Sequence, residues 1–339
     1  MAGALRKTMV YLGLAEDDER YEGYDEYDYD EPAHAQAPAG IVPTVFAPGL
    51  ISGPAHDSAP AFLPSGDTVY FGRSSAQQST ILVSRRDDAN HWLPPRIAGF
   101  SGTWNDMEPA MSPDGHFLVF ISNRPERDGD AAVEGFFNGS RQHGGRLWRV
   151  ERRGDGWSEP TLLPATVNTG TSIYAPSVAA DGSLYFMTTD PHTGKFRLFR
   201  AQSRDGGYLP AQPLPFSDGT STDVDPAVAP DESFLVFGSG RLPGRGIDLF
   251  VVFREGAGWG QPVHLGNDVN TTKSDAEPRL SPDGRTLYLS SERMVPVHFP
   301  RTPAQAAADV ARMQAWDNGN YNVWHVPLAP LIARARQAH

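Results

Sequence analysis

Short apolar runs separated by turn residues make up most of this sequence. The clearest example lies at residues 108–124, where an acid and a proline open one strand, Ser-Pro-Asp-Gly follows, and the apolar run 117–122 forms the next strand. Proline presets φ and glycine tolerates positive φ, so Ser-Pro-Asp-Gly favours a tight turn. The β-branched and aromatic residues after it favour an extended strand. The pattern therefore predicts a β-hairpin.

The same hairpin pattern occurs five times along the chain. Each copy begins at a proline that follows an acidic residue or an alanine, and ends in an aromatic-rich strand. These prolines are Pro60, Pro109, Pro176, Pro226 and Pro278. They are separated by 49, 67, 50 and 52 residues, and a Gly-rich insertion at residues 126–145 accounts for the longest interval. A repeat of this length built from short strands indicates a propeller or a solenoid.

A third strand follows each hairpin, and in several units a fourth segment begins with a tryptophan and a proline. Four strands per repeat fit a propeller blade better than a solenoid rung. The last unit lacks a fourth segment, but residues 42–52 carry the pattern of one before the first unit. We therefore expect an all-β fold, a five-bladed β-propeller of four-stranded antiparallel blades, closed by an N-terminal strand that completes the last blade. The insertions are too short and too polar to supply a sixth blade.

Residues 1–40 do not share the repeat pattern. Leu5, Met9 and Leu12 follow helical spacing beside two basic residues, which predicts a short amphipathic helix with weak peripheral membrane contact. Residues 16–31 contain ten acids, one arginine and four tyrosines, so we expect a disordered acidic leader, followed by an Ala/Pro linker. The expected parts of the chain are the leader at residues 1–40, the propeller at residues 41–330 and a C-terminal tail at residues 331–339.

Composition narrows the functions to consider. The 339 residues include no cysteine, which excludes a disulfide framework, a thiolate nucleophile and a zinc–thiolate site. The net charge is −12, of which residues 1–40 contribute −7, so the repeats are mildly acidic and a nucleic-acid partner is not expected. No segment approaches the roughly 20 apolar residues of a membrane span, and the leader is too short and interrupted for a secretory signal. These features favour the cytoplasm or the inner face of a membrane.

Acids and arginines recur at fixed places in the repeats. In four units an arginine ends the hairpin 16 residues after an acid, giving the pairs Asp57–Arg73, Glu108–Arg124, Asp225–Arg241 and Glu277–Arg293. The start of one strand of an antiparallel hairpin faces the end of the next strand. We therefore expect each acid to meet its arginine at the rim, meaning the end of each blade where the innermost strand begins. Partly exposed pairs of this kind contribute about 0–1 kcal/mol each to stability.

Three units carry a second acid before the proline, namely Asp106, Asp223 and Asp275. If the innermost strand lines the channel, these carboxylates crowd one mouth, where two charges about 10 Å apart repel by roughly 1.7 kcal/mol at an effective dielectric constant of about 20. Such a mouth favours a divalent cation such as calcium, a basic peptide or a cationic ligand. Unit three breaks the ring, because Ile173-Tyr174-Ala175 replaces the acids and Asp190 stands where other units carry an arginine. The candidate binding residues are Asp106, Glu108, Asp223, Asp225, Asp275, Glu277, Arg124, Arg241, Arg293 and Tyr174.

These repeats resemble the TolB-like propeller repeats, whose core reads acid-Pro-x-x-Ser-Pro-Asp-Gly followed by an aromatic-rich strand and Ser-Asn-Arg. Residues 108–124 carry that pattern nearly whole, and the resemblance extends over residues 42–328. It implies a propeller that serves as a binding scaffold, with relatives that are often periplasmic. TolB itself has six blades and a further domain, and this chain departs from it on both points.

Residues 1–32 resemble the N-terminus of SepF, a bacterial cell-division protein, through Met-Ala-Gly-Ala-x-Arg-Lys and Tyr-Leu-Gly-Leu-Ala-Glu-Asp-Asp, followed by the acidic, Tyr-rich linker. The resemblance implies a helix that binds membrane. The second domain of that family, an α/β domain that polymerises and binds FtsZ, has no counterpart here. The division function is therefore not implied for this chain.

Two functions follow from these features. The first is non-catalytic binding, by a monomer and without a cofactor, of a protein or peptide such as a basic one at the acidic rim and on the insertions at residues 126–145 and 294–320. The alternative is a glycoside hydrolase-like or metal-dependent enzyme that uses the rim carboxylates. Glycoside hydrolysis needs two carboxyl groups, one with a raised pKa, whereas the expected arginine partners would lower the pKa values. An unpaired, buried carboxyl near the axis would therefore favour the enzyme.

Overall fold

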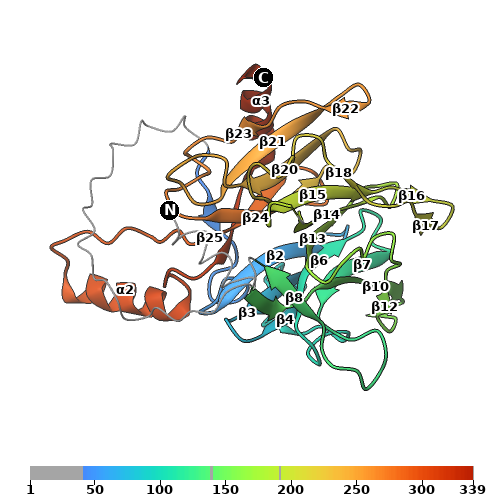
Figure 1. Cartoon of the computed structure of the whole chain (residues 1–339). Coiled ribbons are helices and arrows are strands. Elements are labelled where there is room, and N and C mark those ends of the chain that lie inside the picture. Colours follow the sequence, from blue (N-terminus) through green and yellow to red (C-terminus); the bar gives the residue numbers. More distant parts are fainter. Residues whose placement is uncertain (1–40, 138–139, 191, 339) are drawn as a thin grey trace.

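The structure is a computed structural model that describes residues 41–137, 140–190 and 192–338. It is a five-bladed β-propeller, as predicted (Figure 1). The innermost strands of the five blades contact one another in a closed ring around the central channel, in the order β2, β6, β13, β19 and β24. Of the chain's described helices, none is long and apolar enough to cross a bilayer.

Each blade is a four-stranded antiparallel sheet, and some third strands pair with one further short strand. Blade 1 consists of β2 (His56–Phe62), β3 (Thr68–Ser74), β4 (Ser79–Arg85) and β5 (Arg96–Ile97). Blade 2 consists of β6 (Asp106–Met111), β7 (Phe117–Ser122), β10 (Arg146–Arg153) and β12 (Thr161–Leu162), with β11 (Gly156–Trp157) beside β10. Blade 3 consists of β13 (Ile173–Val178), β14 (Leu184–Thr189), β15 (Phe196–Ala201) and β18 (Gln212–Pro213). Blade 4 consists of β19 (Asp223–Val228), β20 (Phe234–Ser239), β21 (Asp248–Glu255) and β23 (Val263–His264), with β22 (Gly258–Trp259) beside β21. Blade 5 consists of β24 (Asp275–Leu280), β25 (Thr286–Ser291), β26 (Asn322–Pro327) and β1 (Thr44–Val45).

Two small hairpins and two helices complete the described chain. The hairpins pair β8 (Glu134–Phe137) with β9 (Ser140–His143), and β16 (Ser203–Arg204) with β17 (Gly207–Tyr208). The helices are α2 (Pro303–Ala315) and α3 (Leu328–Ala338). Helix α2 stands away from the sheets at the left of Figure 1, whereas α3 packs on blades 4 and 5.

The N-terminal strand closes the ring. Strand β1 pairs antiparallel with β26, with Thr44 opposite His325 and Val45 opposite Trp324. The Phe46 backbone N–H continues the ladder by donating to the Val323 carbonyl at 2.8 Å. Blade 5 is therefore built from both ends of the described chain, and its outer edge is paired as the sequence predicts.

We expect removal of residues 1–53 to lower the melting temperature by more than 10 °C and to cause self-association. The truncated chain loses β1 and leaves the backbone groups of β26 as an open sheet edge, which can template pairing with another chain. Thermal unfolding and size-exclusion chromatography would measure both effects. A chain that starts at residue 41 is the control and should behave like the full-length protein. Equal melting temperatures for the two truncations would show that β1 does not hold the ring together.

Every innermost strand contains a β-bulge just before its opening proline. The register between the first two strands shifts at this place in all five blades. The residue before the proline has positive φ, between 48° and 55°, and these residues are Ala59, Glu108, Ala175, Asp225 and Glu277. A non-glycine residue in this region costs about 1–3 kcal/mol, so the bulge is a strained feature repeated five times. It interrupts the alternation of side chains and brings those of Glu108, Asp225 and Glu277 from three blades close together.

Aromatic side chains fix neighbouring blades to one another. Trp157 of blade 2 donates its indole N–H to the Tyr70 hydroxyl of blade 1 at 2.9 Å, and their rings meet edge to face. Trp259 of blade 4 lies edge to face against Tyr185 of blade 3. These tryptophans follow the third strand of their units, so the recurrent Trp of the sequence is an element of inter-blade packing.

The C-terminal residues form a packed helix. Leu328, Leu331 and Ala335 of α3 are buried in the core shared by blades 4 and 5, and Arg334 pairs with Asp268 at 2.7 Å.

The division of the chain at residues 40 and 330 stays a prediction. The predicted amphipathic helix, the acidic leader and the SepF-like segment lie outside the described residues.

Candidate functional site

Four aspartates at the rim are buried and paired with arginine. Arg73 donates to Asp57 at 2.6 Å, and the Nη2 atoms of Arg124, Arg241 and Arg293 donate to Asp106, Asp223 and Asp275 at 2.7–2.8 Å. The four aspartates are at most 1% exposed. The rim therefore presents arginine side chains and backbone rather than free carboxylates.

Three of these aspartates also hold the loops that lead into the innermost strands. Asp275 accepts hydrogen bonds from the backbone N–H and hydroxyl of Thr271, at 2.6 and 2.8 Å, and from the Ser291 hydroxyl at 2.6 Å. The backbone N–H groups of Gly53 and Gly102 donate in the same way to Asp57 and Asp106, each four residues further on. Burial raises the pKa of Asp57 to about 6, against the lowering effect of Arg73. Asp57, Asp106 and Asp275 thus each join a loop to the far end of their hairpin.

The predicted pairing of acid and arginine is right in blade 1 and wrong in blades 2, 4 and 5. In blade 1, Asp57 lies directly opposite Arg73. In blade 2, the residue opposite Asp106 is Ser122, and Arg124 bends back to reach Asp106 instead of Glu108. Blades 4 and 5 repeat this arrangement with their own aspartate, serine and arginine. The bulge is the reason, because it removes the second acid from the hairpin ladder.

The second acids lie on the channel axis, and we call Glu108, Asp225 and Glu277 the axial carboxyls. They are 1–2% exposed. Glu108 Oε2 accepts from the Ala175 backbone N–H of blade 3 at 2.5 Å, and Asp225 Oδ2 accepts from the Glu277 N–H of blade 5 at 3.1 Å. The Ser290 hydroxyl donates to Glu277 Oε2 at 2.8 Å. Two of the three acids therefore link one blade to the next.

The axial carboxyls do not all ionise easily. Burial, the charge of Asp225 and that of Glu277 raise the pKa of Glu108 well above its usual range. Burial and Glu277 raise the pKa of Asp225 to about 7, with Arg279 acting in the opposite direction. Within the described residues, Glu108 Oε1 and Asp225 Oδ1 have no hydrogen-bond partner. The expectation that arginines lower the pKa values of all these acids is therefore wrong for this pair, because the hairpin arginines bind the rim aspartates.

Blade 3 differs from the others, as its sequence suggests. Tyr174 is fully buried, and burial together with the nearby Glu108 charge raises its pKa. Asp190 occupies the arginine position and pairs with Arg197 of the third strand at 2.9 Å. Blade 3 therefore keeps an ion pair at the rim, but it joins the end of the second strand to the third strand.

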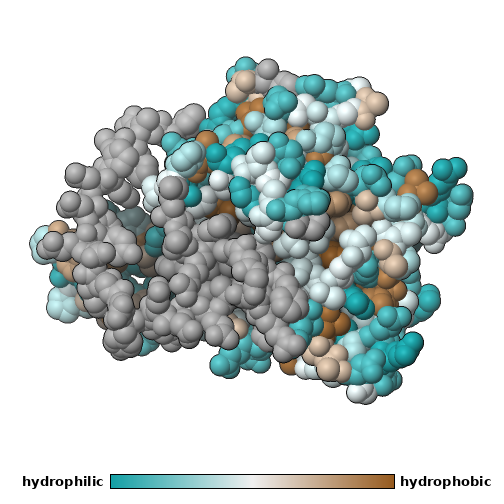
Figure 2. Space-filling view, viewed as in Figure 1, coloured by the Kyte–Doolittle hydropathy of each residue, from teal (hydrophilic) through white to brown (hydrophobic). Residues whose placement is uncertain are grey.

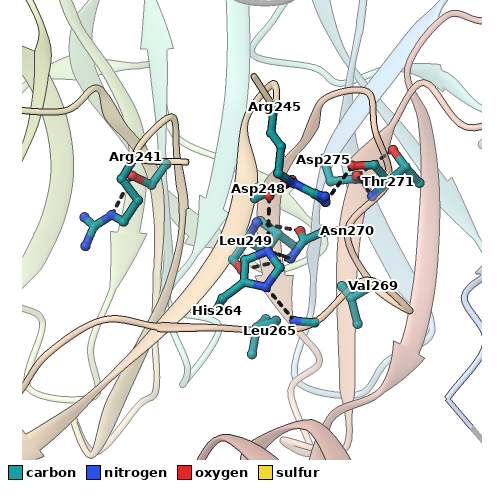
Figure 3. A network of polar contacts seen from close by, with 12 residues as sticks. Arg241, Arg245, Asp248, Leu249, His264, Leu265, Val269, Asn270, Thr271 and Asp275 are labelled. Carbon is teal, nitrogen blue, oxygen red and sulfur yellow. Dashed lines mark hydrogen bonds and ion pairs between the residues drawn. The ribbon is translucent and has the colours of Figure 1, made fainter. Parts of the chain in front are cut away.

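A polar network at the outer part of blade 4, shown in Figure 3, was not found from the sequence. Buried Asp248 binds the Arg245 guanidinium and lies 3.1 Å from His264 Nε2. Asn270 accepts from the Leu249 N–H at 2.6 Å and donates to the Leu249 carbonyl at 3.1 Å. Arg245 also donates to the Thr271 carbonyl at 2.9 Å. The network fixes the segment that leads to Asp275, and its groups are engaged in holding the fold.

Arg279 is a further residue that the sequence analysis missed. It follows the proline of blade 5 at a position that is Ala61, Ala110, Ser177 and Ala227 in the other blades. A single large charged residue among four small ones was a visible signal once the repeats were aligned. Arg279 is 6% exposed and lines a cavity of about 100 Å³ in the channel.

The insertion between β25 and β26 carries the most exposed apolar surface. Ten large hydrophobic residues are exposed in the described part of the chain, and six belong to this insertion: Met294, Val295, Val297, Phe299, Val310 and Met313. No residue of α2 is buried. On the face shown in Figure 2, apolar side chains otherwise form small patches among hydrophilic ones. We call these six residues the apolar insertion surface.

In residues 41–137, 140–190 and 192–338, no group of three or more His, Asp or Glu residues is arranged to hold a metal ion. Calcium binding at the channel mouth stays a prediction.

The insertion at residues 126–145 forms the hairpin β8–β9 beside blade 2.

Comparisons with known proteins give the fold. No family model and no curated protein sequence matches the chain. Among solved structures, the chain is similar to TolB from Acinetobacter baumannii, with 12% identity, a TM-score of 0.45, and coverage of 80% of this chain and 54% of that one. It is also similar to BT0996 in its RGII complex, with 12% identity, a TM-score of 0.51, and coverage of 85% and 91%. A gluconolactonase from Xanthomonas campestris, XC5397, matches with 14% identity, a TM-score of 0.46, and coverage of 86% and 87%. The chain thus spans about half the length of the TolB structure.

Proposed function

We propose that this protein is a non-catalytic propeller that binds a protein partner through the apolar insertion surface of blade 5. The observation that carries the proposal is the concentration of exposed apolar side chains there, with Phe299 76% exposed. Exposed apolar side chains that gather in one segment of a protein are typical of an interaction site. The insertion leaves the propeller at the rim, where the sequence analysis placed the partner.

The insertion is held as a rigid platform. Thr302 caps α2 in a capping box with Gln305, and Pro303 occupies the first helical position. An ion-pair chain then runs from Arg301 to Asp309, Arg312 and Asp317, with distances of 2.7–2.9 Å. Trp316 packs edge to face against Trp324 of β26. A surface that is ordered before binding loses little conformational entropy when a partner docks.

Charge favours a different protein over the other occupants. The charged side chains of the insertion pair with each other, so its surface is apolar without a strong charge of its own. The chain as a whole carries −12, which repels a second copy and an anionic membrane and favours a basic partner. We therefore propose a protein with a positive net charge that contributes apolar side chains to the contact. The buried rim aspartates support the loops of this face rather than touching the partner.

The test is a charge insertion in the apolar insertion surface. We expect the double variant Val297→Asp/Phe299→Asp to lose the partner that the wild type captures from the native cell extract, with at least 30-fold weaker binding of the purified partner, as expected for a loss of about 2 kcal/mol. The matched control is Leu93→Asp/Ile97→Asp, which places the same charges on exposed apolar positions of blade 1. The control should bind like the wild type.

Three results would overturn the proposal. Equal partner binding by both variants would remove the insertion from the interface. A dimer seen in sedimentation velocity, and lost only in Val297→Asp/Phe299→Asp, would make a second copy the occupant. Binding to phosphatidylserine vesicles that is lost in the same variant would make it a membrane surface.

A second candidate function rests on the axial carboxyls. Glu108 and Asp225 combine burial, raised pKa values and a carboxyl oxygen without a hydrogen-bond partner in the described residues, which are features of acid–base groups in enzymes. A carbohydrate-active enzyme, however, needs an open cleft. The axial cavity of about 100 Å³ is small beside the roughly 300–1,000 Å³ typical of ligand sites. Hydrolysis of an aryl glycoside by the wild type, and its loss in Glu108→Gln, would place this function first.

A further inference from the structure

An open cavity lies between blades 2 and 3. Its volume is about 290 Å³, and its wall includes the hairpin turns of both blades, so it lies on the side of the ring opposite the rim. Blade 2 contributes the turn at residues 112–114, Phe117 and Arg149, and blade 3 contributes the turn at residues 179–182 and the hairpin β16–β17 at the right of Figure 1. We call this space the seam cavity, because it occupies the seam between two blades.

The seam cavity is present where the other seams carry larger packing groups. Trp157 and Trp259 follow the third strands of blades 2 and 4 and pack on the preceding blade, whereas blade 3 has Tyr208 at the same place. Trp92 of blade 1 packs edge to face on Phe46 next to β1 of blade 5. Helix α3 covers the seam between blades 4 and 5. Tyrosine is smaller than tryptophan, so space remains between blades 2 and 3.

Arg149 is the charged residue of the cavity wall that the repeat does not explain. It lies opposite Val119, and the equivalent residues of the other blades are Val83, Phe199, Val251 and His325. Its guanidinium lies 3.6 Å from the centre of the Phe117 ring, and its Nε donates to Glu151 at 2.7 Å. Burial raises the pKa of Tyr208, and the Arg149 charge opposes this effect. The side chain is thus held in place, yet it is 28% exposed and keeps the N–H groups of Nη1 and Nη2 as donors.

The hairpin turns add two carboxylates to the cavity wall. Asp114 and Asp181 have side chains that are 56% and 52% exposed. Asp181 accepts from the N–H and the hydroxyl of Ser183 at 2.8 and 2.9 Å, and Asp114 accepts from the Ser112 hydroxyl at 2.6 Å and the His116 N–H at 3.0 Å. A carboxylate offers about four lone-pair positions, so both groups retain capacity to accept from a ligand.

We propose that the seam cavity binds a neutral sugar. Arg149 repels a cation, and Asp114 and Asp181 repel an anion such as a phosphate, so the wall favours an uncharged ligand that both donates and accepts hydrogen bonds. Sugar hydroxyls can donate to the carboxylates and accept from the guanidinium, while the apolar face of the sugar ring packs on Tyr208. The volume equals that of about ten water molecules, which is the size of a hexose.

The size and the place of the cavity agree with this assignment. Its volume of about 290 Å³ is close to the lower end of the roughly 300–1,000 Å³ typical of small-molecule sites. It lies on the opposite side of the ring from the apolar insertion surface. The sugar site therefore does not depend on the proposed protein partner, and the two can be tested separately.

The experiment is saturation-transfer difference NMR of the full chain with glucose, galactose, mannose, N-acetylglucosamine, cellobiose and lactose. We expect at least one of these sugars to bind with a Kd of about 1 mM or tighter. The 6-phosphate and the 2-amino analogue of the bound sugar should bind more weakly, because each adds a charge that the wall repels. Absence of binding by every sugar of the panel, or tighter binding of a charged analogue, would overturn the proposal.

Two variants test the cavity with residues that other blades carry at the same positions, which protects the fold. Arg149→Val removes the donors, and Tyr208→Trp fills the space, so each should weaken sugar binding by about tenfold or more. The matched control is Arg153→Val, because Arg153 is exposed on the same strand and outside the cavity. It should bind like the wild type.

Thermal unfolding checks that the Arg149→Val and Tyr208→Trp variants keep the native fold. Sugar binding by both variants that equals that of the wild type would show that the sugar binds elsewhere and would overturn the proposal. The Val297→Asp/Phe299→Asp variant should bind the sugar like the wild type, so a failure of the proposed protein interaction leaves this test intact.

Discussion

Asp275→Ala is expected to lower the free energy of unfolding by about 3–5 kcal/mol, the effect of removing one partner from a buried ion pair. The substitution leaves the Arg293 guanidinium, the Thr271 backbone N–H and the Ser291 hydroxyl without their shared acceptor. Equilibrium unfolding in urea, followed by tryptophan fluorescence, measures the change. Because Asp275 opens the innermost strand of the blade that closes the ring, the loss should also reduce cooperativity of unfolding.

The control for this prediction is Asp88→Ala, which removes an exposed carboxylate from a loop of blade 1. It should change the free energy of unfolding by no more than about 0.5 kcal/mol. A loss in Asp275→Ala that is as small as that of the control would show that the rim pairs are replaceable. The rim aspartates would then be free to serve binding, as the sequence analysis supposed.

The Asp225→Asn variant is expected to gain stability relative to the wild type as the pH rises. The folded pKa of Asp225 is about 7 and its ordinary value is 3.8, so folding favours the protonated form. The stability that this group contributes is complete below about pH 4 and is lost as the pH rises through 7. Asparagine cannot ionise, and it keeps an oxygen to accept from the Glu277 N–H. Between pH 4 and pH 8, the variant should therefore gain about 4 kcal/mol on the wild type, since one pKa unit corresponds to about 1.4 kcal/mol.

The charges around Asp225 determine this result. Glu277 raises its pKa, Arg279 lowers it, and Glu108 is coupled to it across the axis. Urea unfolding at several pH values from 4 to 8 measures the effect. Asp231→Asn is a control of opposite sign, because hydrogen bonds from Ser233 hold the pKa of Asp231 below its ordinary value. That variant should lose stability relative to the wild type at neutral pH and lose less at low pH. A stability difference for Asp225→Asn that does not change with pH would contradict the prediction.

These two results would separate the roles of acids that look alike in the sequence. Asp275 and Glu277 are two residues apart, and both precede the same proline. In the structure one is neutralised at the rim and the other lies on the axis beside Asp225. Asp275 should stabilise the fold through its bonds to Arg293, Thr271 and Ser291. Asp225 should stabilise it in its protonated form, which is the property that a catalytic acid would also need.

The repeated hairpins could be predicted from local chemistry alone. A Ser-Pro-Asp-Gly turn and an aromatic-rich strand specify a hairpin without help from distant residues, and five copies at a regular spacing leave few folds to consider. The role of residues 42–52 also followed from the sequence, because the last unit lacks a fourth strand and an open sheet edge is unfavourable. Strand β1 lies where this argument placed it.

The pairing of the acids could not be predicted, because it depends on the bulge. The prediction assumed that an acid and an arginine 16 positions apart lie opposite each other in the hairpin. This is true of Asp57 and Arg73 in blade 1. In blade 2 the same rule connects Asp106 with Ser122, and the positive φ of Glu108 removes that residue from the ladder. Nothing in the hairpin sequence alone states which of two acids is displaced.

The sequence by itself determined the repeat, the number of blades and the closure of the ring, because turn chemistry, strand periodicity and edge pairing are local or follow from counting strands. Only the tertiary structure decided which acids are neutralised and which converge on the axis. These properties arise between residues of different blades, often more than 50 positions apart, such as Glu108 and Ala175. Their distances, and therefore their electrostatic energies, exist only after the ring has closed.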